Sequence, residues 1–208
     1  ASRGYNVVLV NDGSADNTAS LAQTTPAIVL KMPFNVGVGG AMRTAFLYAS
    51  QYDYDYVVQV DADGQHNPAQ IPNLIETMKN GANIAIGARF AGKTDYEVKG
   101  PRKWAMVTLS KGLTKITKET LTDTTSGFRG ADKKAIQLFA QHYPSEYLGD
   151  TVESLVIASR AGLKIAQIPV HMNPRQGGMP SQNTITSILY LGRAWLALLI
   201  ALTRKPVA

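Results

Sequence analysis

The sequence predicts an α/β protein in which helices flank a mostly parallel sheet. Short apolar runs rich in valine and isoleucine alternate along the chain with longer segments that carry apolar residues at helical spacing. This alternation is typical of strand–helix–strand units, which build parallel sheets. A length of 208 residues suits one domain. We expect that domain over residues 1–182 and a separate apolar helix, amphipathic or interfacial, over residues 183–208.

Composition narrows the choice of partners. The formal net charge is +6, and 45% of the residues are hydrophobic. A basic balance of this size suits an anionic partner, such as a nucleotide, a lipid phosphate or a membrane surface. The chain has no dense run of lysine and arginine and no nucleic-acid-binding motif, so we expect no nucleic-acid partner. The absence of cysteine excludes disulfides, thiolate metal ligands and a cysteine nucleophile.

The first predicted strand, Tyr5–Val10, runs into a polar turn and then a short helix that reaches about residue 24. Gly13 permits a tight turn, and either Ser14 or Asp16 is suited to cap the helix. Asp12 stands at the carboxyl end of the strand, where ligands bind in open α/β sheets. The motif is also compatible with an ordinary strand–turn–helix whose polar residues only cap the helix.

The second predicted strand, residues 27–31, leads into a glycine-rich stretch over 33–41 and a helix that ends near residue 51. Glycines ahead of a helix N-terminus are typical of a phosphate cradle. Their spacing, however, matches neither the Gly-x-Gly-x-x-Gly motif nor a P-loop. Close packing of the helix on the sheet explains these glycines at least as well.

The third predicted strand, residues 57–60, runs directly into Asp61 and Asp63. Alternation along an extended chain would place both carboxylates on the same side. Two carboxylates so close repel each other unless a cation lies between them, and Mg²⁺ binds one or two carboxylates together with phosphate oxygens. Gln65 and His66 follow on the loop, within reach of the same ion. The competing interpretation is a strand that ends in an aspartate-rich turn.

The rest of the domain continues the alternation. The predicted elements are, in order, a helix over 68–80, a strand over 82–87, helices over 104–118, 133–141 and 150–160, and a strand over 163–170. Arg129 lies in a polar stretch and offers a fork of donors suited to phosphate or to a neighbouring carboxylate. Asp150 and Glu153 begin a helix, where acidic side chains complement the helix dipole.

Residues 185–202 are almost continuously apolar but are interrupted by Arg193. A helix that spans a membrane needs about 20 apolar residues, and an arginine at its centre is costly. A helix that lies in the membrane interface, with Arg193 reaching the headgroups, fits this segment better. The alternative is a helix packed on the domain or on a second copy of the chain.

Six motifs occur together and in order. They are Asn11-Asp12-Gly13-Ser14, Asn35-Val36-Gly37, Asp61-Ala62-Asp63-Gly64-Gln65-His66, Gly87-Ala88-Arg89-Phe90, Ser126-Gly127-Phe128-Arg129 and Arg175-Gln176-Gly177-Gly178. Each motif is weak alone, but six in register are strong. The chain resembles the family 2 glycosyltransferases with the GT-A fold, close to their dolichyl- or polyprenyl-phosphate sugar synthase branch. The resemblance covers almost the whole chain.

This resemblance implies an inverting transfer of a sugar from a UDP- or GDP-linked donor to a polyprenyl phosphate, in cell-envelope glycan synthesis. The residues implied in binding the nucleotide sugar are Asp12, Gly13, Asn35, Gly37, Asp61, Ala62, Asp63 and Arg175. Those implied for the acceptor are Ser126, Gly127, Arg129 and Arg175. Mg²⁺ or Mn²⁺ is expected on Asp61, Asp63 and Gln65. The residues implied in catalysis are Asp63, Arg129 and Asp150.

The acceptor has two interpretations. A phosphate is already an anion and needs no general base, whereas a hydroxyl on a lipid-linked or cell-wall glycan needs Asp150 to take its proton. The resemblance also implies a peripheral enzyme on the cytoplasmic face of the cell membrane, with a second copy or a membrane protein as partner.

The N-terminus departs from the family pattern. The resemblance implies an earlier strand, ahead of Tyr5, that carries part of the nucleotide-base pocket, and we expect this chain to begin at the second strand. Two other classes of function compete with transfer. One is a non-catalytic assembly partner at the membrane. The other is a nucleotidyltransferase, which normally opens with a glycine-rich triphosphate loop that does not precede Tyr5 here.

Overall fold

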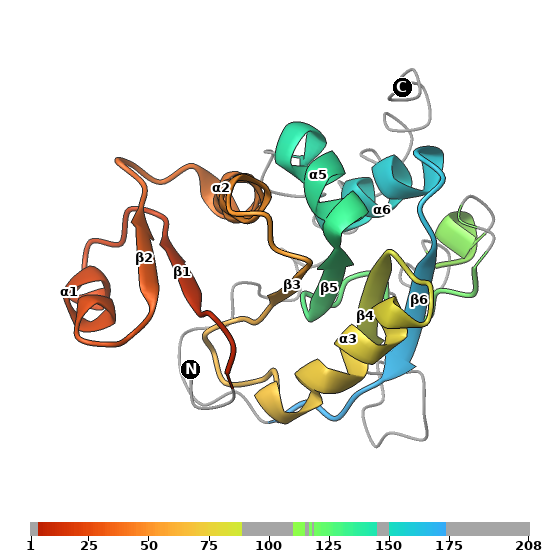
Figure 1. The fold of residues 1–208 in the computed structure, drawn as a ribbon, viewed down its shortest axis with the longest axis horizontal. Helices are drawn as coiled ribbons and strands as arrows, with labels where there is room; N and C mark the ends of the chain where they lie inside the picture. The colour runs from red at the N-terminus through yellow and green to blue at the C-terminus, as the bar shows by residue number, and fades with distance from the viewer. Residues whose placement is uncertain (1–3, 89–109, 115–116, 118, 145–149, 174–208) are drawn as a thin grey trace, which may run out of the picture.

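The computed structural model describes residues 4–88, 110–114, 117, 119–144 and 150–173. Within these residues the strands form two sheets (Figure 1). In the smaller sheet, β1 (Val8–Asn11) and β2 (Ile28–Lys31) pair in parallel. In the larger sheet, four strands lie in the order β3-β5-β4-β6. Their bounds are Tyr56–Gln59 for β3, Ile84–Ala88 for β4, Arg129–Asp132 for β5 and Ile165–Pro169 for β6.

The larger sheet contains one strand that the sequence did not predict. β4 and β6 pair in parallel, whereas β5 runs antiparallel to both of its neighbours, β3 and β4. The residues of β5, Arg-Gly-Ala-Asp, have little intrinsic preference for a strand, so pairing along both edges holds this segment extended. The predicted α/β fold with a mostly parallel sheet is confirmed, with β5 as its antiparallel member.

The helices agree with the prediction in order, and their bounds differ by a few residues. They are α1 (Thr18–Gln23), α2 (Gly37–Gln51), α3 (Ile71–Lys79), α5 (Lys133–His142) and α6 (Asp150–Arg160), with a 3₁₀ turn, η1 (Pro68–Gln70), before α3. Residues 110–114 are also helical. α2 begins within the glycine-rich stretch, earlier than the sequence suggested.

Helices cover both faces of the larger sheet (Figure 1). α3 packs on one face, where its Leu74 shares an apolar cluster with Ala85 of β4. α2, α5 and α6 supply a second cluster on the other face, which includes Phe139. Ile84 and Ile86 of β4 join this second cluster, as the alternation of side chains along a strand requires. The fold is therefore a three-layer arrangement with the sheet in the middle.

β5 passes directly into α5 through Asp132. The Asp132 carboxylate accepts a hydrogen bond from the Ala135 N–H at 2.9 Å, which caps the helix. Its other oxygen accepts a hydrogen bond from the Asn83 side chain at 2.7 Å, just ahead of β4. This one side chain fixes the end of β5 against the residue ahead of β4 and caps the start of α5.

Several predicted features lie outside the described residues. They are the basic loop 91–103, most of the helix 104–118, Arg175, and the C-terminal helix over 183–208. In the part of the chain that the structure describes, none of the helices combines the length and the apolar character that crossing a membrane requires.

Candidate functional site

Four residues predicted to bind a nucleotide sugar meet at the carboxyl end of β1. The Asp12 carboxylate accepts hydrogen bonds from the backbone N–H groups of Val36, at 2.7 Å, and Gly37, at 2.8 Å. The Asn35 side chain donates to the Asp12 carbonyl oxygen at 3.1 Å. Gly13 has φ of +68°, and a Cβ there would lie 2.8 Å from the Asn35 nitrogen, so this turn requires glycine. The two motifs, distant in sequence, thus form one loop cluster.

Asp12 occupies the N-terminus of α2. An anion at this position satisfies N–H groups that the helix leaves unpaired and interacts with the positive end of its dipole. Because the carboxylate already accepts from Val36 and Gly37, these two N–H groups do not form the phosphate cradle that the glycine-rich stretch suggested. The alternative interpretation, close packing of the helix on its strand, is favoured, since α2 contacts β1.

Asp61 and Asp63 lie in a turn that follows β3. The strand ends at Gln59, and residues 62–64 turn away from the extended direction. The Asp63 carboxylate accepts a hydrogen bond from the Gln65 N–H at 3.0 Å, the pattern of an Asx turn. The argument from strand alternation is therefore wrong, because the chain is no longer extended at Asp63. The Asp61 side chain is 47% exposed and remains available to a ligand.

His66 supports this turn from inside the protein. Its Nδ1 accepts a hydrogen bond from the Asp61 N–H at 2.9 Å, and its ring stacks on Phe128 with the centroids 5.0 Å apart. Since a backbone N–H only donates, Nδ1 carries no proton, and Nε2, 3.7 Å from Asp61 Oδ2, holds the ring proton. The histidine is 6% exposed, and both of these contacts hold the turn that carries Asp61.

Gly127 allows a second loop to approach Asp61. A Cβ on Gly127 would lie 3.0 Å from Asp61 Oδ2 and 3.3 Å from Oδ1, so a side chain there would displace the carboxylate. Gln59 approaches from β3, and its Nε2 donates to Asp61 Oδ1 at 3.2 Å. A residue predicted for the donor and a residue predicted for the acceptor are therefore in contact.

Ser126 and Arg129 make their hydrogen bonds within the protein. Ser126 is 2% exposed, and its hydroxyl donates to the Gly87 carbonyl oxygen at 2.6 Å. Ser126 therefore supports the loop from within. The Arg129 guanidinium donates to the carbonyl oxygens of Thr124 at 2.6 Å, of Ser126 at 2.7 Å and of Thr151 at 2.7 Å.

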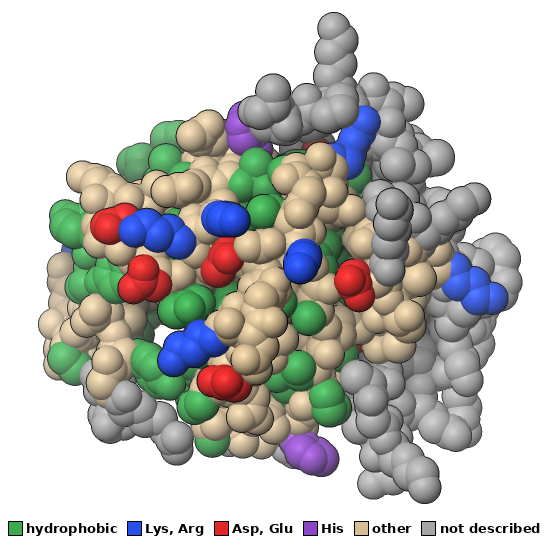
Figure 2. Space-filling view, turned by 45° about the vertical axis from the view of Figure 1, so that its right-hand side comes forward, with side chains coloured by type: hydrophobic (Ala, Val, Ile, Leu, Met, Phe, Trp, Pro, Cys, Tyr) green, Lys and Arg blue, Asp and Glu red, His purple; other side chains and the backbone are tan. Residues whose placement is uncertain are grey.

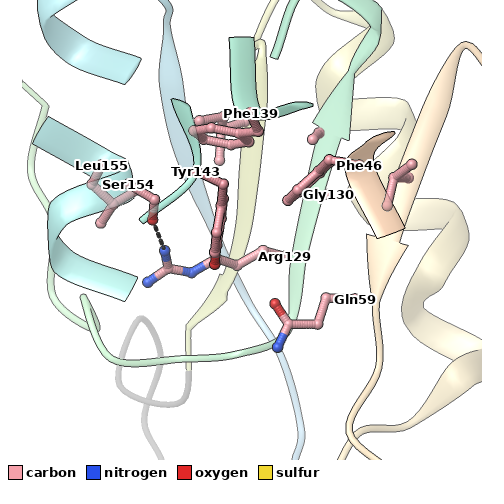
Figure 3. A pocket seen from close by; sticks show the side chains of 11 residues that line it. Phe46, Gln59, Arg129, Gly130, Phe139, Tyr143, Ser154 and Leu155 are labelled. Carbon is pink, nitrogen blue, oxygen red and sulfur yellow. Dashed lines mark hydrogen bonds between the residues drawn. The ribbon is translucent and has the colours of Figure 1, made fainter. Parts of the chain in front are cut away.

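Asp150 is a buried carboxyl at the start of α6. It is 6% exposed, and the Tyr143 hydroxyl donates to its Oδ2 at 3.5 Å. Burial raises the pKa of the Asp150 carboxyl above its ordinary value, and the positive charge of Arg129 acts in the opposite direction. Figure 3 shows the Arg129 guanidinium extending to Ser154 of α6, with Tyr143 beside it. A carboxyl with a raised pKa is suited to proton transfer near neutral pH.

The cavity drawn in Figure 3 lies between these groups and β3. Its volume is about 20 Å³, and its lining includes Gln59, Arg129, Tyr143 and Ser154. A cavity of this size holds roughly one water molecule. It therefore belongs to the packing between the sheet and α6 and is too small for a sugar or a phosphate.

A larger cavity lies between the two sheets. Its volume is about 310 Å³, and its walls include Val8 and Val10 of β1 and Val58 and Val60 of β3. α2 lines its floor, and Asp61 lies at its margin. Among the described strands, β1 pairs with β2 and β3 pairs with β5, so the other edge of each lacks a ladder partner. We call this cavity the inter-sheet slot.

The side chains after β3 are compatible with a hard divalent cation. Asp61 and Asp63 offer carboxylate oxygens, and the described residues contain no group of three or more His, Cys, Asp or Glu side chains placed to hold a metal. Mg²⁺ needs one or two protein carboxylates when phosphate oxygens supply further ligands. The residues present therefore fit an ion that binds together with a phosphorylated ligand.

The sequence matches a known family model over most of the described domain. The model of the family described as "Glycosyl transferase family 2" matches residues 2–139. The chain belongs to glycosyl transferase family 2. The undecaprenyl-phosphate mannosyltransferase of Micrococcus luteus is 33% identical to this glycosyltransferase over 184 residues, which cover 83% of this chain and 73% of the relative.

A second relative and a solved structure are also similar to this family 2 glycosyltransferase. The UDP-N-acetylglucosamine–dolichyl-phosphate N-acetylglucosaminyltransferase of Methanococcus voltae is 28% identical over 192 residues, which cover 79% of this chain and 73% of the relative. Among solved structures, glucosyl-3-phosphoglycerate synthase of Mycobacterium tuberculosis with Mn²⁺, UDP and glucosyl-3-phosphoglycerate has a TM-score of 0.69 at 17% identity. The matched region covers 94% of this chain and 68% of the synthase. This likeness confirms the predicted GT-A fold.

Two residues that shape the site of this glycosyltransferase were missed by sequence reasoning. Gln59 holds the Asp61 carboxylate, and Tyr143 holds the Asp150 carboxyl. A signal for Gln59 was present, because it is the polar residue within the run Val-Val-Gln-Val ahead of the carboxylate pair. Tyr143 follows a helix and has no such signal, since only the fold brings it to the start of α6.

Charges on the described surface of this glycosyltransferase are mixed. On the face drawn in Figure 2, lysine and arginine side chains lie among aspartate and glutamate side chains without a patch of one sign. Lys133 and Asp53, for example, form an ion pair at 2.6 Å. The net charge of +6 is therefore not concentrated in the described residues on this face.

Proposed function

We propose that this glycosyltransferase moves a sugar from a nucleoside diphosphate sugar to a polyprenyl phosphate, with inversion at the anomeric carbon, in the synthesis of a cell-envelope glycan. The relatives support this acceptor, because one is named for undecaprenyl phosphate and another for dolichyl phosphate. The observation that carries the proposal is the contact of the exposed Asp61 carboxylate with Gly127. It brings a donor motif and an acceptor motif to the same strand end.

The donor is assigned to two neighbouring groups of residues. The loop cluster at β1 contributes Asp12, Gly13, Asn35 and Gly37, and the turn after β3 contributes Asp61, Ala62 and Asp63. Asp12 keeps lone pairs beyond the two that α2 uses, and these can accept a hydrogen bond from the base. Arg175 lies outside the described residues, and its proposed role is to bind phosphate.

We assign Asp61, Asp63 and Gln65 to a Mg²⁺ or Mn²⁺ ion that binds with the donor diphosphate. When bound, such an ion neutralises charge on the leaving diphosphate. The Mycobacterium tuberculosis synthase was solved with Mn²⁺ and UDP, which supports a divalent ion here. In this chain, Gln59 and His66 hold Asp61 in place for that role.

Removal of one carboxylate tests the metal assignment. Asp63→Ala should abolish metal-dependent binding of UDP or GDP in calorimetry, because it removes one of the two carboxylates assigned to the ion. Asp16→Ala is the matched control, since Asp16 also accepts a hydrogen bond from a nearby backbone N–H but is fully exposed on another turn. Wild-type affinity in Asp63→Ala with Mn²⁺ present would contradict the assignment.

A donor screen tests the reaction itself. The protein is incubated with UDP- and GDP-linked sugars and with vesicles that contain polyprenyl phosphate, and lipid-linked product is read by mass. A polyprenyl-phosphate sugar supports the proposal. If a form of the protein that includes the earlier strand gives no product and shows no metal-dependent nucleotide binding, a non-catalytic assembly partner is indicated. Pyrophosphate released from a sugar phosphate and a nucleoside triphosphate would indicate a nucleotidyltransferase.

A second candidate acceptor is a hydroxyl on a lipid-linked or cell-wall glycan. The burial of Asp150, with its raised pKa, favours this acceptor, because such a carboxylate is a good general base. Asp150→Asn separates the two, since a phosphate acceptor needs no base. Turnover close to wild type would indicate a phosphate, and a loss of about 100-fold or more would indicate a hydroxyl.

The proposed location is the cytoplasmic face of the cell membrane, with the protein held peripherally through residues 183–208. A second copy or a membrane protein is proposed as a partner at this surface. The apolar run with Arg193 supports an interfacial helix. Deletion of residues 183–208 should release the protein from anionic vesicles in sedimentation. Unchanged sedimentation would show that another part of the chain binds the vesicles.

The inter-sheet slot is proposed to receive the earlier strand that the family resemblance implies. Among the described strands, β1 and β3 each have one edge without a ladder partner, and both strands line a cavity with apolar walls, which suits one more strand. A form of the protein with a strand and a crossover helix ahead of residue 1 should melt at a higher temperature and bind UDP or GDP more tightly than residues 1–208. Equal melting temperatures and affinities would contradict this proposal.

A further inference from the structure

Arg129 joins two segments that are far apart in sequence. On one side its guanidinium donates to the carbonyl oxygens of Ser126 at 2.7 Å and Thr124 at 2.6 Å. On the other side it donates to the carbonyl oxygen of Thr151 at 2.7 Å and to Ser154 Oγ at 3.3 Å. Both of the latter residues lie in the first turns of α6. One side chain therefore links the loop before β5 to the start of α6.

These hydrogen bonds depend on the shape of the guanidinium. Arginine presents five N–H donors in a rigid planar fork, and the bonds described here leave from Nε and from both terminal nitrogens. A lysine carries the same charge on a single ammonium with three donors, so it cannot reproduce the hydrogen bonds to all four acceptors. The environment of Arg129 therefore selects for geometry as well as for charge.

Each of the two linked segments carries or contacts a carboxylate assigned to the proposed reaction. The loop ends in Gly127, whose lack of a Cβ permits the close approach to the Asp61 carboxylate. The start of α6 carries Asp150, whose carboxyl accepts from Tyr143 and is buried. Arg129 lies between them on β5, directly opposite Gln59 in the ladder. A change in the guanidinium contacts would shift both segments relative to each other.

We propose that Arg129 is a positioning residue for sugar transfer, which holds the 124–127 loop beside Asp61 and the first turn of α6 in one geometry. This inference rests on the proposed function, and it replaces the phosphate-binding role that the family resemblance implied for this arginine. The reaction then needs the hydrogen-bonding fork of Arg129, and a positive charge at this position is not sufficient.

Hydrogen exchange tests the linkage without any need for activity. Arg129→Lys should make the amides of residues 124–127 and 151–154 exchange at least about tenfold faster, because hydrogen bonds to their carbonyl and hydroxyl groups are lost. Arg43→Lys is the matched control, since Arg43 also donates to two backbone carbonyls, those of Ala140 and Gln141, but between α2 and α5. Unchanged exchange at both segments in Arg129→Lys would overturn the proposal.

Kinetics separate positioning from phosphate binding. With the wild-type reaction established, Arg129→Lys should lower kcat by about 10- to 100-fold while KM for the acceptor and metal-dependent UDP or GDP binding stay within about twofold. Arg129→Gln should lower kcat by no more than Arg129→Lys does. If Arg129→Lys keeps the wild-type kcat and Arg129→Gln raises the KM for the acceptor, the proposal is overturned in favour of phosphate binding.

A milder variant covers the case in which Arg129→Lys does not fold. Ser154→Ala removes one acceptor of the guanidinium and leaves its charge in place. It should lower kcat by about threefold with an unchanged KM, and it should speed exchange in residues 151–154. A wild-type kcat together with wild-type exchange would count against the linkage. If the wild-type protein transfers no sugar, the proposed function fails, while the exchange data still decide whether Arg129 links the two segments.

Discussion

Replacement of Asp12 by alanine removes the two hydrogen bonds that hold the start of α2. The carboxylate accepts from the Val36 N–H at 2.7 Å and from the Gly37 N–H at 2.8 Å, and both contacts are partly buried. A hydrogen bond to a charged group contributes about 1.5–3 kcal/mol, and partial exposure places these two near the lower end, so we expect a loss of about 3 kcal/mol. In a domain of this size that corresponds to a fall in Tm of roughly 6–12 °C.

The assay is thermal and urea denaturation of a short series. Asp12→Asn keeps one acceptor oxygen, so it should lose about half as much stability as Asp12→Ala. Asp16→Ala should not change Tm measurably, because Asp16 caps an exposed turn. An alanine variant at position 12 that melts within about 2 °C of the wild type would refute the reasoning, because the two hydrogen bonds would then contribute almost nothing.

Three further predictions concern the two carboxylates of the site and one helix cap. Asp150→Asn should raise the free energy of unfolding at neutral pH. The pKa of Asp150 is higher in the folded than in the unfolded protein, so its ionisation costs stability as the pH rises through that interval, and asparagine avoids this cost. Denaturation at several pH values should show the gain vanish below about pH 4. Gly127→Ala should weaken metal-dependent UDP binding at least about tenfold with Tm nearly unchanged, because the added Cβ would crowd the half-exposed Asp61 carboxylate. Wild-type UDP affinity of this variant in calorimetry would contradict the prediction. Asp132→Ala should cost at least about 1–2 kcal/mol in urea denaturation, because the cap on α5 and the hydrogen bond from Asn83 are both lost, without a change in nucleotide affinity.

The sequence by itself determined the order of the elements and the chemistry at the strand ends. Valine-rich runs mark strands because β-branched side chains fit the pleated surface of a sheet, and this holds for β1 and β3, whose residues are mostly half-buried. Turn formers after these runs place Asp12 and Asp61 where strands end. These signals are local, so they can be read without knowledge of the fold.

Only the tertiary structure decided what those residues contact. The partners of Asp12 lie 24 and 25 residues away, and those of Arg129 include Thr151, 22 residues away. β5 exists because β3 and β4 pair with both of its edges, since its own residues favour no strand. Hydrogen bonds between segments so distant depend on how the chain is folded back, which no local pattern encodes. That is why the carboxylate pair was predictable from sequence, whereas the linkage through Arg129 was not.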